Sequence, residues 1–507
     1  MANELYDLLV VGGGINGVGV ARDAAGRGLK VLLCEQADLG WATSSASTKL
    51  IHGGLRYLEH YAFGLVRESL KERELLLRAA PHLVRSLRFV LPHDQDQRPA
   101  WMIRAGLFLY DHLSRRRIMA GSSRLNLAED PLGRIMHHPP ETAFAYSDCQ
   151  VDDSRLVIVN AVDAAARGAE ILTRTACTAA QRKGDRWQAT LRDAHAGYRL
   201  VEARVMVNLA GPWVNRFLSD ALSMPAKAHG RLIKGSHMVL PRLYDDPRAL
   251  LLQNDDGRVV FVIPYQERFS LIGTTEVEHP ADPKVETITD QELAYLSRAV
   301  QRYLAVEVDP AQAVWTFSGL RPLFDDAHAS ASAVTRDFRL QLDAPPGAAP
   351  LLTVFGGKLT TYRKLAEEVL AKLKRHLPSM GRPWTHRAVL PGGELEGLSP
   401  DKYAERLCAE RPWLPLATAR RYAHSYGSRA EMILGQAQCL EDLGRHLGDG
   451  LNVAEVRYLR RHEWARTARD ILWRRTKLGL HAKAATVENL EVWLTTHPSP
   501  EEQDDAP

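Results

Sequence analysis

The chain has 507 residues, which is too long for one compact core and predicts about two or three domains. Its hydrophobic content of 45% and charged content of 25% are ordinary for a soluble globular protein. The net charge of +4 is small for this length. It fits anionic small molecules or an anionic membrane surface and argues against a nucleic-acid-binding protein.

The cysteines are scattered and include no CxxC pair, which argues against a zinc site and a disulfide framework and suits a reducing compartment. They are Cys34, Cys149, Cys177, Cys408 and Cys439. The N-terminal segment carries acidic residues where a secretory signal would be basic. No run reaches the roughly 18 apolar residues that a membrane-spanning helix needs. We therefore expect a cytoplasmic protein without a bound metal.

The chain opens with the pattern of a nucleotide-binding unit. Apolar runs at 7–11 and 30–35 predict buried parallel strands, and residues 15–28 predict a helix rich in small side chains. A GxGxxG sequence at the strand–helix junction permits a tight turn and close approach of a pyrophosphate to the helix N-terminus. An acidic residue at the end of the second strand would accept hydrogen bonds from ribose hydroxyls. The predicted cofactor contacts are Gly12, Gly14, Ile15, Asn16, Gly17 and Glu35.

The next segment, TSSASTKLIHGGLRYLEH at 43–60, is rich in hydroxyl groups and then places a histidine, an arginine and a tyrosine around two glycines. A glycine pair lets the backbone press against a flat ring. Hydroxyls and backbone amides of this loop would line the cofactor, and a polar turn without a ligand is the alternative. The predicted contacts are Ser44, Ser45, Thr48, Lys49, Leu50 and Gly54. From Phe63 to Arg88 the spacing of leucines and charges predicts a helix.

Two later segments favour FAD over NAD as the dinucleotide. Strand composition at 204–211, 258–264 and 269–276 marks a second β-rich region, and the first of these strands ends in NLAGPW. Near residue 355 a strand, two glycines and a helix follow one another, so that a helix N-terminus would face the flavin and stabilise negative charge there. The further predicted cofactor contacts are Cys177, Ala210, Gly211, Trp213, Gly319, Gly357, Lys358, Leu359 and Thr360.

Seven stretches together resemble the FAD-dependent glycerol-3-phosphate dehydrogenase family over nearly the whole chain. They are GGGINGVGVARDAAGRG, TSSASTKLIHGGLRYLE, NLAGPW, RLIKGSH, GTTE, SGLRPL and FGGKLTTYRKLAE. Leu209-Ala210 and Glu276 depart from the pattern expected of the family, but neither change removes a group assigned to the chemistry. The resemblance implies oxidation of sn-glycerol 3-phosphate to dihydroxyacetone phosphate, with electrons passed to a quinone at a membrane surface. It also implies a homodimer.

The resemblance implies a Rossmann-type FAD-binding domain of the glutathione-reductase or D-amino-acid-oxidase kind, an antiparallel-sheet substrate domain and a C-terminal all-helical cap domain. We expect the FAD-binding domain at 1–80, 146–225 and 348–388, and the substrate domain at 81–145 and 226–347. Helical periodicity predicts the C-terminal domain at 389–496, and the acidic residues 497–507 are expected to be disordered.

A phosphorylated substrate requires fixed cations, and arginine suits phosphate because its planar fork donates two hydrogen bonds. The candidate substrate contacts are Arg56, Tyr57, Arg321, Arg336 and Lys358. Loss of the C2 hydroxyl proton requires a base, which favours histidine. We expect His52, His237 or Lys358 to take that proton, with Arg321 also in the catalytic set, and the residues leave the choice open.

A quinone is apolar, so the enzyme is expected to bind the cytoplasmic membrane peripherally. The first candidate for contact is the run from Trp101, where apolar and aromatic side chains precede clustered arginines, and the second is 461–480. An oxidase of the same fold that reduces O₂ to peroxide is the alternative function. A scaffold without turnover would lack the histidine, arginine and lysine positions named above.

Overall fold

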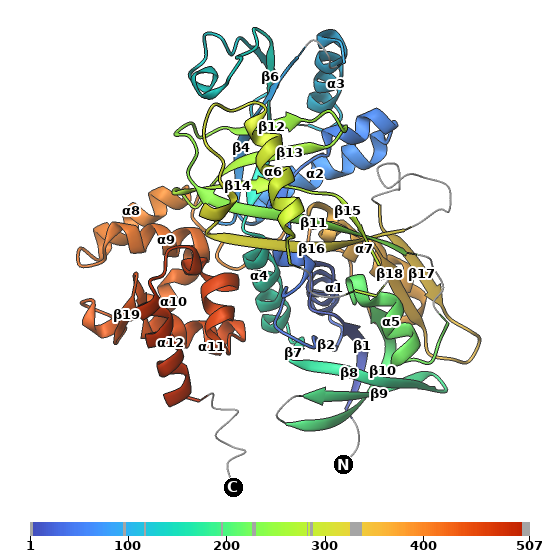
Figure 1. The fold of residues 1–507 in the computed structure, drawn as a ribbon. Coiled ribbons are helices and arrows are strands. Elements are labelled where there is room, and N and C mark those ends of the chain that lie inside the picture. Colours follow the sequence, from blue (N-terminus) through green and yellow to red (C-terminus); the bar gives the residue numbers. More distant parts are fainter. Residues whose placement is uncertain are drawn as a thin grey trace.

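The structure, a computed structural model, describes residues 4–94, 98–115, 118–193, 196–225, 230–280, 282–283, 287–324 and 337–498. Two large sheets lie one above the other, and a helical domain lies beside them (Figure 1). The fold class predicted from the sequence is confirmed. Its domain boundaries stay a prediction, and the strand at 143–151 crosses the boundary expected at residue 146.

The first sheet has a parallel centre of apolar strands in the order β17-β18-β10-β1-β2-β7. Its strands are β1 (Leu5–Val11), β2 (Val31–Cys34), β7 (Glu170–Leu172), β8 (Thr175–Lys183), β9 (Arg186–Asp193), β10 (Gly197–Asn208), β17 (Arg339–Asp343) and β18 (Leu351–Phe355). Strands β8 and β9 form an antiparallel extension from β10. The central strands are buried on both faces, which explains their continuous apolar sequence.

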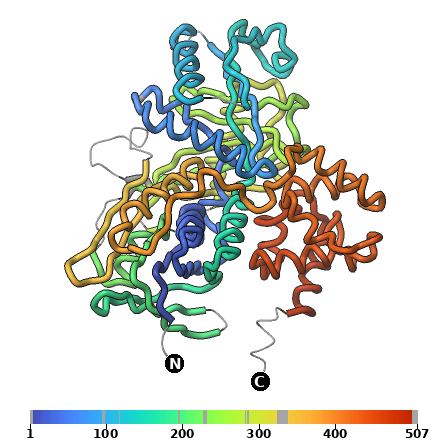
Figure 2. Tube along the Cα trace, turned by 180° about the vertical axis from the view of Figure 1, so that it is seen from behind, coloured from blue at the N-terminus to red at the C-terminus, as the bar shows by residue number. Residues whose placement is uncertain are grey.

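Helices α1 (Ile15–Gly26), α4 (Asp153–Ala166) and α7 (Tyr362–Leu373) pack on one face of this sheet in a single apolar cluster. The other face packs against α5 (Val214–Asp220). Helix α7 comes late in the chain, but it lies beside α1, which is close to the N-terminus (Figure 2). Gly19 of α1 makes this close packing possible, because a Cβ atom there would lie 2.8 Å from the ring of Tyr362.

The second sheet is antiparallel apart from the parallel pair β4–β12, and its order is β15-β11-β14-β13-β12-β4-β6-β3, with β16 on β11 and β5 on β6. Its strands are β3 (Leu50–Ile51), β4 (Val84–Pro92), β5 (Ser123–Leu125), β6 (Ala143–Val151), β11 (Gly230–Pro241), β12 (Ala249–Gln253), β13 (Val259–Tyr265), β14 (Phe269–Gly273), β15 (Val277–His279) and β16 (Trp315–Phe324). Helix α6 (Asp290–Gln301) covers one face, while α2 (Phe63–Ala79) and α3 (Ala100–His112) pack with the other.

One predicted element is wrong in its extent. The helix expected from Phe63 to Arg88 ends at Ala79, and residues 84–88 belong to β4. Pro81 is the second residue after this end, and a proline disfavours helical backbone in the residue before it, which is Ala80.

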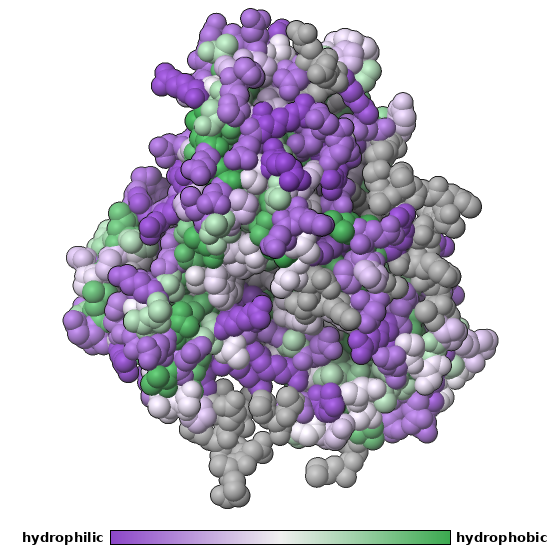
Figure 3. All heavy atoms as spheres, viewed as in Figure 1, coloured by the Kyte–Doolittle hydropathy of each residue, from purple (hydrophilic) through white to green (hydrophobic). Residues whose placement is uncertain are grey.

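The C-terminal domain has its own apolar core and is helical apart from one small hairpin, β19 (His446–Gly448) and β20 (Leu451–Asn452). Its helices are α8 (Pro400–Glu410), α9 (Leu416–Tyr426), α10 (Ala430–Leu434), α11 (Val453–Glu463) and α12 (Ala484–Thr496), with a short π-helix, η10 (Asp470–Arg475), after α11. None of the helices in the described ranges is both long and apolar enough to cross a membrane. Figure 3 shows one face of the molecule, which is mostly hydrophilic with small separate apolar patches.

Candidate active site

A cavity of about 1560 Å³ passes between the two sheets. The end of β1, the segment from Trp41 to Glu59, the turn at 209–213 and the residues from Gly356 to Thr360 line it. Almost every site residue predicted from the sequence contributes to this lining. The exceptions are Gly17, Ser45, Lys49 and His237, which the structure places outside the lining, and Arg336, which lies outside the described residues.

The glycine turn at the start of α1 has the geometry that a dinucleotide site needs. Gly12 has a φ of +113°, and a Cβ atom there would lie 2.4 Å from the carbonyl oxygen of Leu209. A Cβ atom on Gly17 would lie 1.8 Å from the carbonyl oxygen of Gly12, so Gly17 allows the helix to pack on the turn. The N–H of Ile15 donates to Ser44 Oγ at 3.0 Å, which joins the helix start to the hydroxyl-rich loop.

The same turn holds a polar atom that the protein does not satisfy. Asn16 lines the cavity, and its Oδ1 is buried and finds no hydrogen-bond partner among the described residues. A buried acceptor of this kind is rare without a ligand or water to pair with. The glycine turn, the helix N-terminus and this acceptor together fit the expected dinucleotide.

Glu35 is held in place from three sides. Its Oε2 accepts from the N–H of Gly13 at 2.7 Å, and its Oε1 accepts from the N–H of Ala37 and from Trp41 Nε1, each at 2.9 Å. Burial raises the pKa of Glu35, and these three donors oppose that rise. These three donors therefore fix the carboxylate at the wall of the cavity, and its contact with ribose hydroxyls stays a prediction.

Trp41 was missed by the sequence reasoning. Its ring stacks on Trp213 with centroids 5.3 Å apart, and both side chains line the cavity near Glu35. Trp213 was among the predicted cofactor contacts. Nothing in the local sequence around Trp41 indicates that Trp41 contacts the turn at 209–213, which follows β10. This pairing depends on the path of the loop after β2.

The loop of 43–49 forms one wall of the cavity and is anchored from behind. Ser44 and Thr48 line the cavity, whereas Ser45 Oγ donates to the carbonyl of Ala42 at 3.2 Å. Lys49 is outside the cavity lining and forms a fully buried ion pair with Asp153, Nζ to Oδ2 2.9 Å. The side chain of Lys49 therefore has a structural partner, and its contact with the cofactor stays a prediction.

Three of the predicted cations line the cavity. Lys358 Nζ donates to Ser69 Oγ at 2.9 Å and lies 4.9 Å from the ring centre of Tyr57. Arg321 Nη2 donates to Thr274 Oγ1 at 3.0 Å, and its Nη1 lies 3.6 Å from Glu276 Oε1. Arg56 Nη2 donates to the carbonyl of Gly257 at 2.9 Å. Arg56, Arg321 and Lys358 come from three distant segments, and the fold brings all of them to one cavity.

The two candidate histidines differ in their environment. His52 lines the cavity, and its backbone N–H is bonded to Thr360 Oγ1 at 3.3 Å, which ties β3 to the loop before α7. His237 is fully buried, stacks on Phe317 and contacts Thr48 Oγ1 through Nε2 at 2.9 Å. Burial, together with the charges of Arg321 and Lys49, holds the pKa of His237 well below its usual value. His237 therefore lies behind Thr48 as a neutral ring.

A buried carboxylate behind the glycine pair also escaped the sequence reasoning. Asp148 Oδ1 accepts from the N–H of Gly53 at 3.2 Å, from Tyr110 at 2.7 Å and from Arg73 Nη1 at 2.6 Å. A Cβ atom on Gly53 would lie 2.5 Å from the Tyr110 hydroxyl. Asp148 lines the cavity and fixes the backbone that carries His52 and Arg56. It lies in β6, far from any predicted motif, so only the sheet pairing of β6 with β3 reveals it.

No cluster of three or more histidine, cysteine, aspartate or glutamate side chains suited to a metal ion occurs within the described ranges.

Comparison with known proteins identifies two family matches. Residues 7–363 match the model of the FAD dependent oxidoreductase family, and residues 383–496 match the C-terminal domain of alpha-glycerophosphate oxidase. The chain is 49% identical to the aerobic glycerol-3-phosphate dehydrogenase of Escherichia coli strain K12 over 97% of its length and 98% of that protein. It is also 49% identical to the D-erythritol 1-phosphate dehydrogenase of Brucella abortus strain 2308, over 97% of this chain and 98% of the relative.

Among solved structures, the glycerol-3-phosphate dehydrogenase of Bacillus halodurans complexed with FAD is similar over 99% of this chain and 93% of that chain. The TM-score is 0.75 and the sequence identity is 25%.

Proposed function

Because the chain belongs to the family of FAD-dependent oxidoreductases that includes the glycerol-3-phosphate dehydrogenases, we propose that it oxidises sn-glycerol 3-phosphate to dihydroxyacetone phosphate. The observation that carries this proposal is that Arg56, Arg321 and Lys358 line the same cavity as the dinucleotide turn. A dianionic phosphate placed among these cations would hold its carbon chain beside the cofactor.

Bound FAD, held by the glycine turn, Asn16 and Glu35, would supply at its flavin N5 the acceptor for the hydride that C2 of the substrate loses. The residues of the chain bind and orient the substrate for this transfer. We assign the phosphate to Arg321 and Arg56, whose guanidinium groups donate in pairs, and the nearby Tyr57 ring fixes the position of the Lys358 ammonium. The positive charge of Lys358 would also stabilise negative charge that develops on the C2 oxygen.

We propose His52 as the group that accepts the C2 hydroxyl proton. It lines the cavity, as do Arg56, Arg321 and Lys358, whereas His237 is outside the lining and contacts the lining residue Thr48. A general base must lie within hydrogen-bond reach of the proton it takes, and only a cavity-lining imidazole meets that requirement without rearrangement. His237 is then a support for Thr48.

We propose that the electrons pass to a quinone at the cytoplasmic membrane surface, to which the protein binds peripherally. Apolar side chains are exposed just before α2 and on α3: Tyr61 by 80%, Trp101 by 70% and Phe108 by 54%. Tyr61 also lines the cavity, as do Met102 and Leu109, so the exposed apolar surface is continuous with the site. We define Tyr61, Phe63, Trp101, Met102, Phe108 and Leu109 as the mouth patch. An apolar acceptor could reach the cavity from a bilayer that contacts this patch.

The other segment expected to contact the membrane, 461–480, is not suited to that role. Arg475 is fully buried in an ion pair with Asp38, and Trp473 packs against Trp315. Most of the side chains that made this run look amphipathic therefore face the protein rather than a lipid surface. Homodimer formation stays a proposal, and sedimentation of the purified protein tests it.

A four-carbon polyol phosphate is a second candidate substrate, because a relative that matches 97% of this chain at 49% identity is named D-erythritol 1-phosphate dehydrogenase. Anaerobic addition of glycerol 3-phosphate to the oxidised flavoprotein should remove the visible flavin absorbance. Erythritol phosphate added in parallel distinguishes the two substrates. Absorbance that persists with glycerol 3-phosphate but disappears with the four-carbon compound would replace the first proposal with the second.

The oxidase alternative is tested on the reduced protein. A quinone analogue should restore the flavin absorbance much faster than air does. Fast reoxidation by air, accompanied by hydrogen peroxide, would instead identify an oxidase.

A further inference from the structure

The C-terminal domain is joined to the FAD-binding layer by ion pairs that are buried on both sides. Arg475 Nη2 donates to Asp38 Oδ1 at 2.8 Å, and Asp38 follows β2. Arg155 of α4 pairs with Glu463 at the end of α11, and both side chains are almost fully buried. Buried pairs contribute little net stability because desolvation opposes them, but they tolerate only a narrow range of geometries. The two domains are therefore held in a fixed relation.

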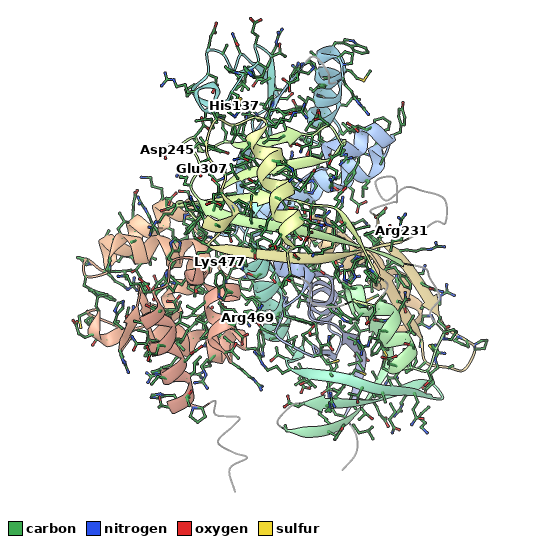
Figure 4. The ribbon with its side chains drawn as sticks, viewed as in Figure 1. His137, Arg231, Asp245, Glu307, Arg469 and Lys477 are labelled. Atoms are coloured by element: carbon green, nitrogen blue, oxygen red, sulfur yellow. The ribbon has the colours of Figure 1, made fainter. Side chains whose placement is uncertain are left out.

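Lys477 is two residues after Arg475 and contacts the same layer closer to the cavity. Its side chain is 2% exposed, and Figure 4 labels it where the C-terminal domain meets the rest of the molecule. Its Nζ donates to Asp152 Oδ1 at 3.1 Å and also to Ser154 Oγ. Asp152 caps α4 by accepting from the N–H of Arg155 at 3.1 Å. Burial would raise the pKa of Asp152, but Lys477 and the other donors around it lower that pKa below its usual value.

The residue after this cap holds the loop that lines the cavity. Asp153 Oδ2 accepts from the N–H of Ser47 at 3.2 Å, from Ser47 Oγ at 2.8 Å and from Lys49 Nζ at 2.9 Å. Lys49 Nζ also donates to the carbonyl of Ser45 at 3.0 Å. One buried lysine and one buried aspartate thus fix the loop of residues 43–49, which we call the cofactor loop.

An aromatic route from the C-terminal domain ends at the same loop. Trp473 packs against Trp315 with centroids 4.9 Å apart, and Trp315 packs against Phe317 at 4.5 Å. Phe317 stacks on His237 at 4.8 Å, and the ring of His237 is bonded to Thr48.

The two routes meet at Lys49, whose Nζ lies 4.6 Å from the ring centre of Phe317. Among the described residues, no residue after Thr360 lines the cavity, so the C-terminal domain acts on the cavity through residues that lie behind the lining.

We propose that Lys477 and Trp473 are positioning residues for the cofactor loop: they hold Ser47, Thr48 and Lys49 from behind, so that the C-terminal domain sets how tightly FAD is held. This inference rests on the proposal that the cavity binds FAD. It assigns the C-terminal domain a role in cofactor retention without any contact between that domain and the cofactor.

The test is the rate at which FAD leaves the full-length holoenzyme, followed by the rise in flavin fluorescence on release. Lys477→Met removes the ammonium group and keeps the length of the side chain. We expect FAD to leave on the order of tenfold faster, because losing a hydrogen bond to a charged group changes an equilibrium constant by about that factor or more. Here that equilibrium is between the held and the released cofactor loop. The visible circular dichroism of the bound flavin should change as well, since it reports the position of the ring against the loop.

Lys477→Arg keeps the charge and should restore slow release. Lys483→Met is the matched control, because Lys483 is exposed on the same domain and undergoes the same chemical change. Wild-type release and an unchanged flavin dichroism in Lys477→Met, whatever its Tm, would overturn the inference. If Lys477→Met does not fold, Trp473→Phe decides the question: faster release supports the inference and wild-type release overturns it. Wild-type protein that binds no FAD would overturn the proposed function itself.

Discussion

At the scale of single residues, some side chains line the cavity, and others lie behind the lining and contact it. Arg321 comes from β16 and reaches the cavity beside Thr274, so its guanidinium is fixed before a substrate binds. His237, from the neighbouring strand β11, lies behind Thr48 and acts on the site through that hydroxyl. Both side chains are in motifs that the sequence singles out, and their burial decides which of them can meet a substrate.

Arg321→Ala should lower kcat/KM for glycerol 3-phosphate by on the order of 100-fold, because paired hydrogen bonds from a guanidinium to phosphate are lost. Steady-state kinetics with a quinone analogue measures the change. Arg231→Ala is the control, since Arg231 lies on β11, pairs with the exposed Glu278 and lies outside the cavity lining (Figure 4). A wild-type kcat/KM in Arg321→Ala would mean that the phosphate binds elsewhere.

Trp41→Phe should weaken FAD binding several-fold, because the variant keeps a ring for stacking on Trp213 but loses the donor to Glu35. Titration of FAD-depleted protein with FAD, followed by tryptophan emission, gives the affinity. Trp101→Phe, at an exposed site on α3, is the control. Equal affinities in the two variants would show that the Trp41 hydrogen bond does not support the cofactor.

At the scale of elements, the sequence was a good guide wherever one element carries its own pattern. The first strand, the glycine turn and helix α1 follow from local rules, and so do the late glycines before α7. The end of α2 was missed because its leucine spacing continues into β4, where sheet pairing with β6 decides the structure. Trp41 and Asp148 could not be predicted, since each reaches the site through a contact between segments far apart in sequence.

Helix α6 is joined to the second sheet through a buried carboxylate. Glu292 pairs with Lys234 at 2.8 Å and accepts hydrogen bonds from the hydroxyls of Ser236 and Thr275. It also forms a capping box with Thr289 at the start of α6, in which each side chain accepts from the backbone N–H of the other residue. Burial would raise the pKa of Glu292, but the bond from Lys234 and the other donors lower it to about 2. A depressed pKa means that this carboxylate stabilises the fold above its unfolded pKa, near 4.5, and that this contribution is lost as the pH falls toward 2.

Glu292→Gln should therefore lower the free energy of unfolding at pH 7 by on the order of 2 kcal/mol, and the difference from wild type should shrink below about pH 4. Urea unfolding across this pH range measures it. Glu307→Gln, at an exposed position after the same helix, is the control. A difference that stays constant down to pH 2 would contradict the assignment of this stability to the ionised carboxylate.

At the scale of the whole molecule, segments of both sheets line the cavity, and the C-terminal domain lies beside the two sheets (Figure 1). The sequence predicted this arrangement of domains through its resemblance to a family rather than through composition or periodicity. It could not predict that the segment 461–480 faces the FAD-binding layer, because an amphipathic run with arginines is compatible with a lipid surface and with a buried ion-pair network.

The mouth patch should carry membrane binding. Replacing Trp101 and Phe108 together with serine should reduce co-sedimentation with anionic phospholipid vesicles by about tenfold or more, because both side chains are exposed and apolar. Glycerol 3-phosphate oxidation with a water-soluble acceptor should remain. The control pair replaces Leu416 and Met432 of the C-terminal domain, which are also exposed. Equal loss of vesicle binding in both pairs would place the membrane contact elsewhere.

The order of strands in the first sheet has a consequence for synthesis of the protein. Strand β1 pairs with β10, β10 pairs with β18, and the glycines before α7 complete the cavity wall. The growing chain therefore cannot finish this sheet until the segment around residue 360 has left the ribosome. Long-range parallel pairing of this kind forms slowly and leaves apolar edges exposed meanwhile. We expect nascent chains shorter than this to capture no FAD and to depend on chaperones, so that cofactor loading is one of the last events in maturation.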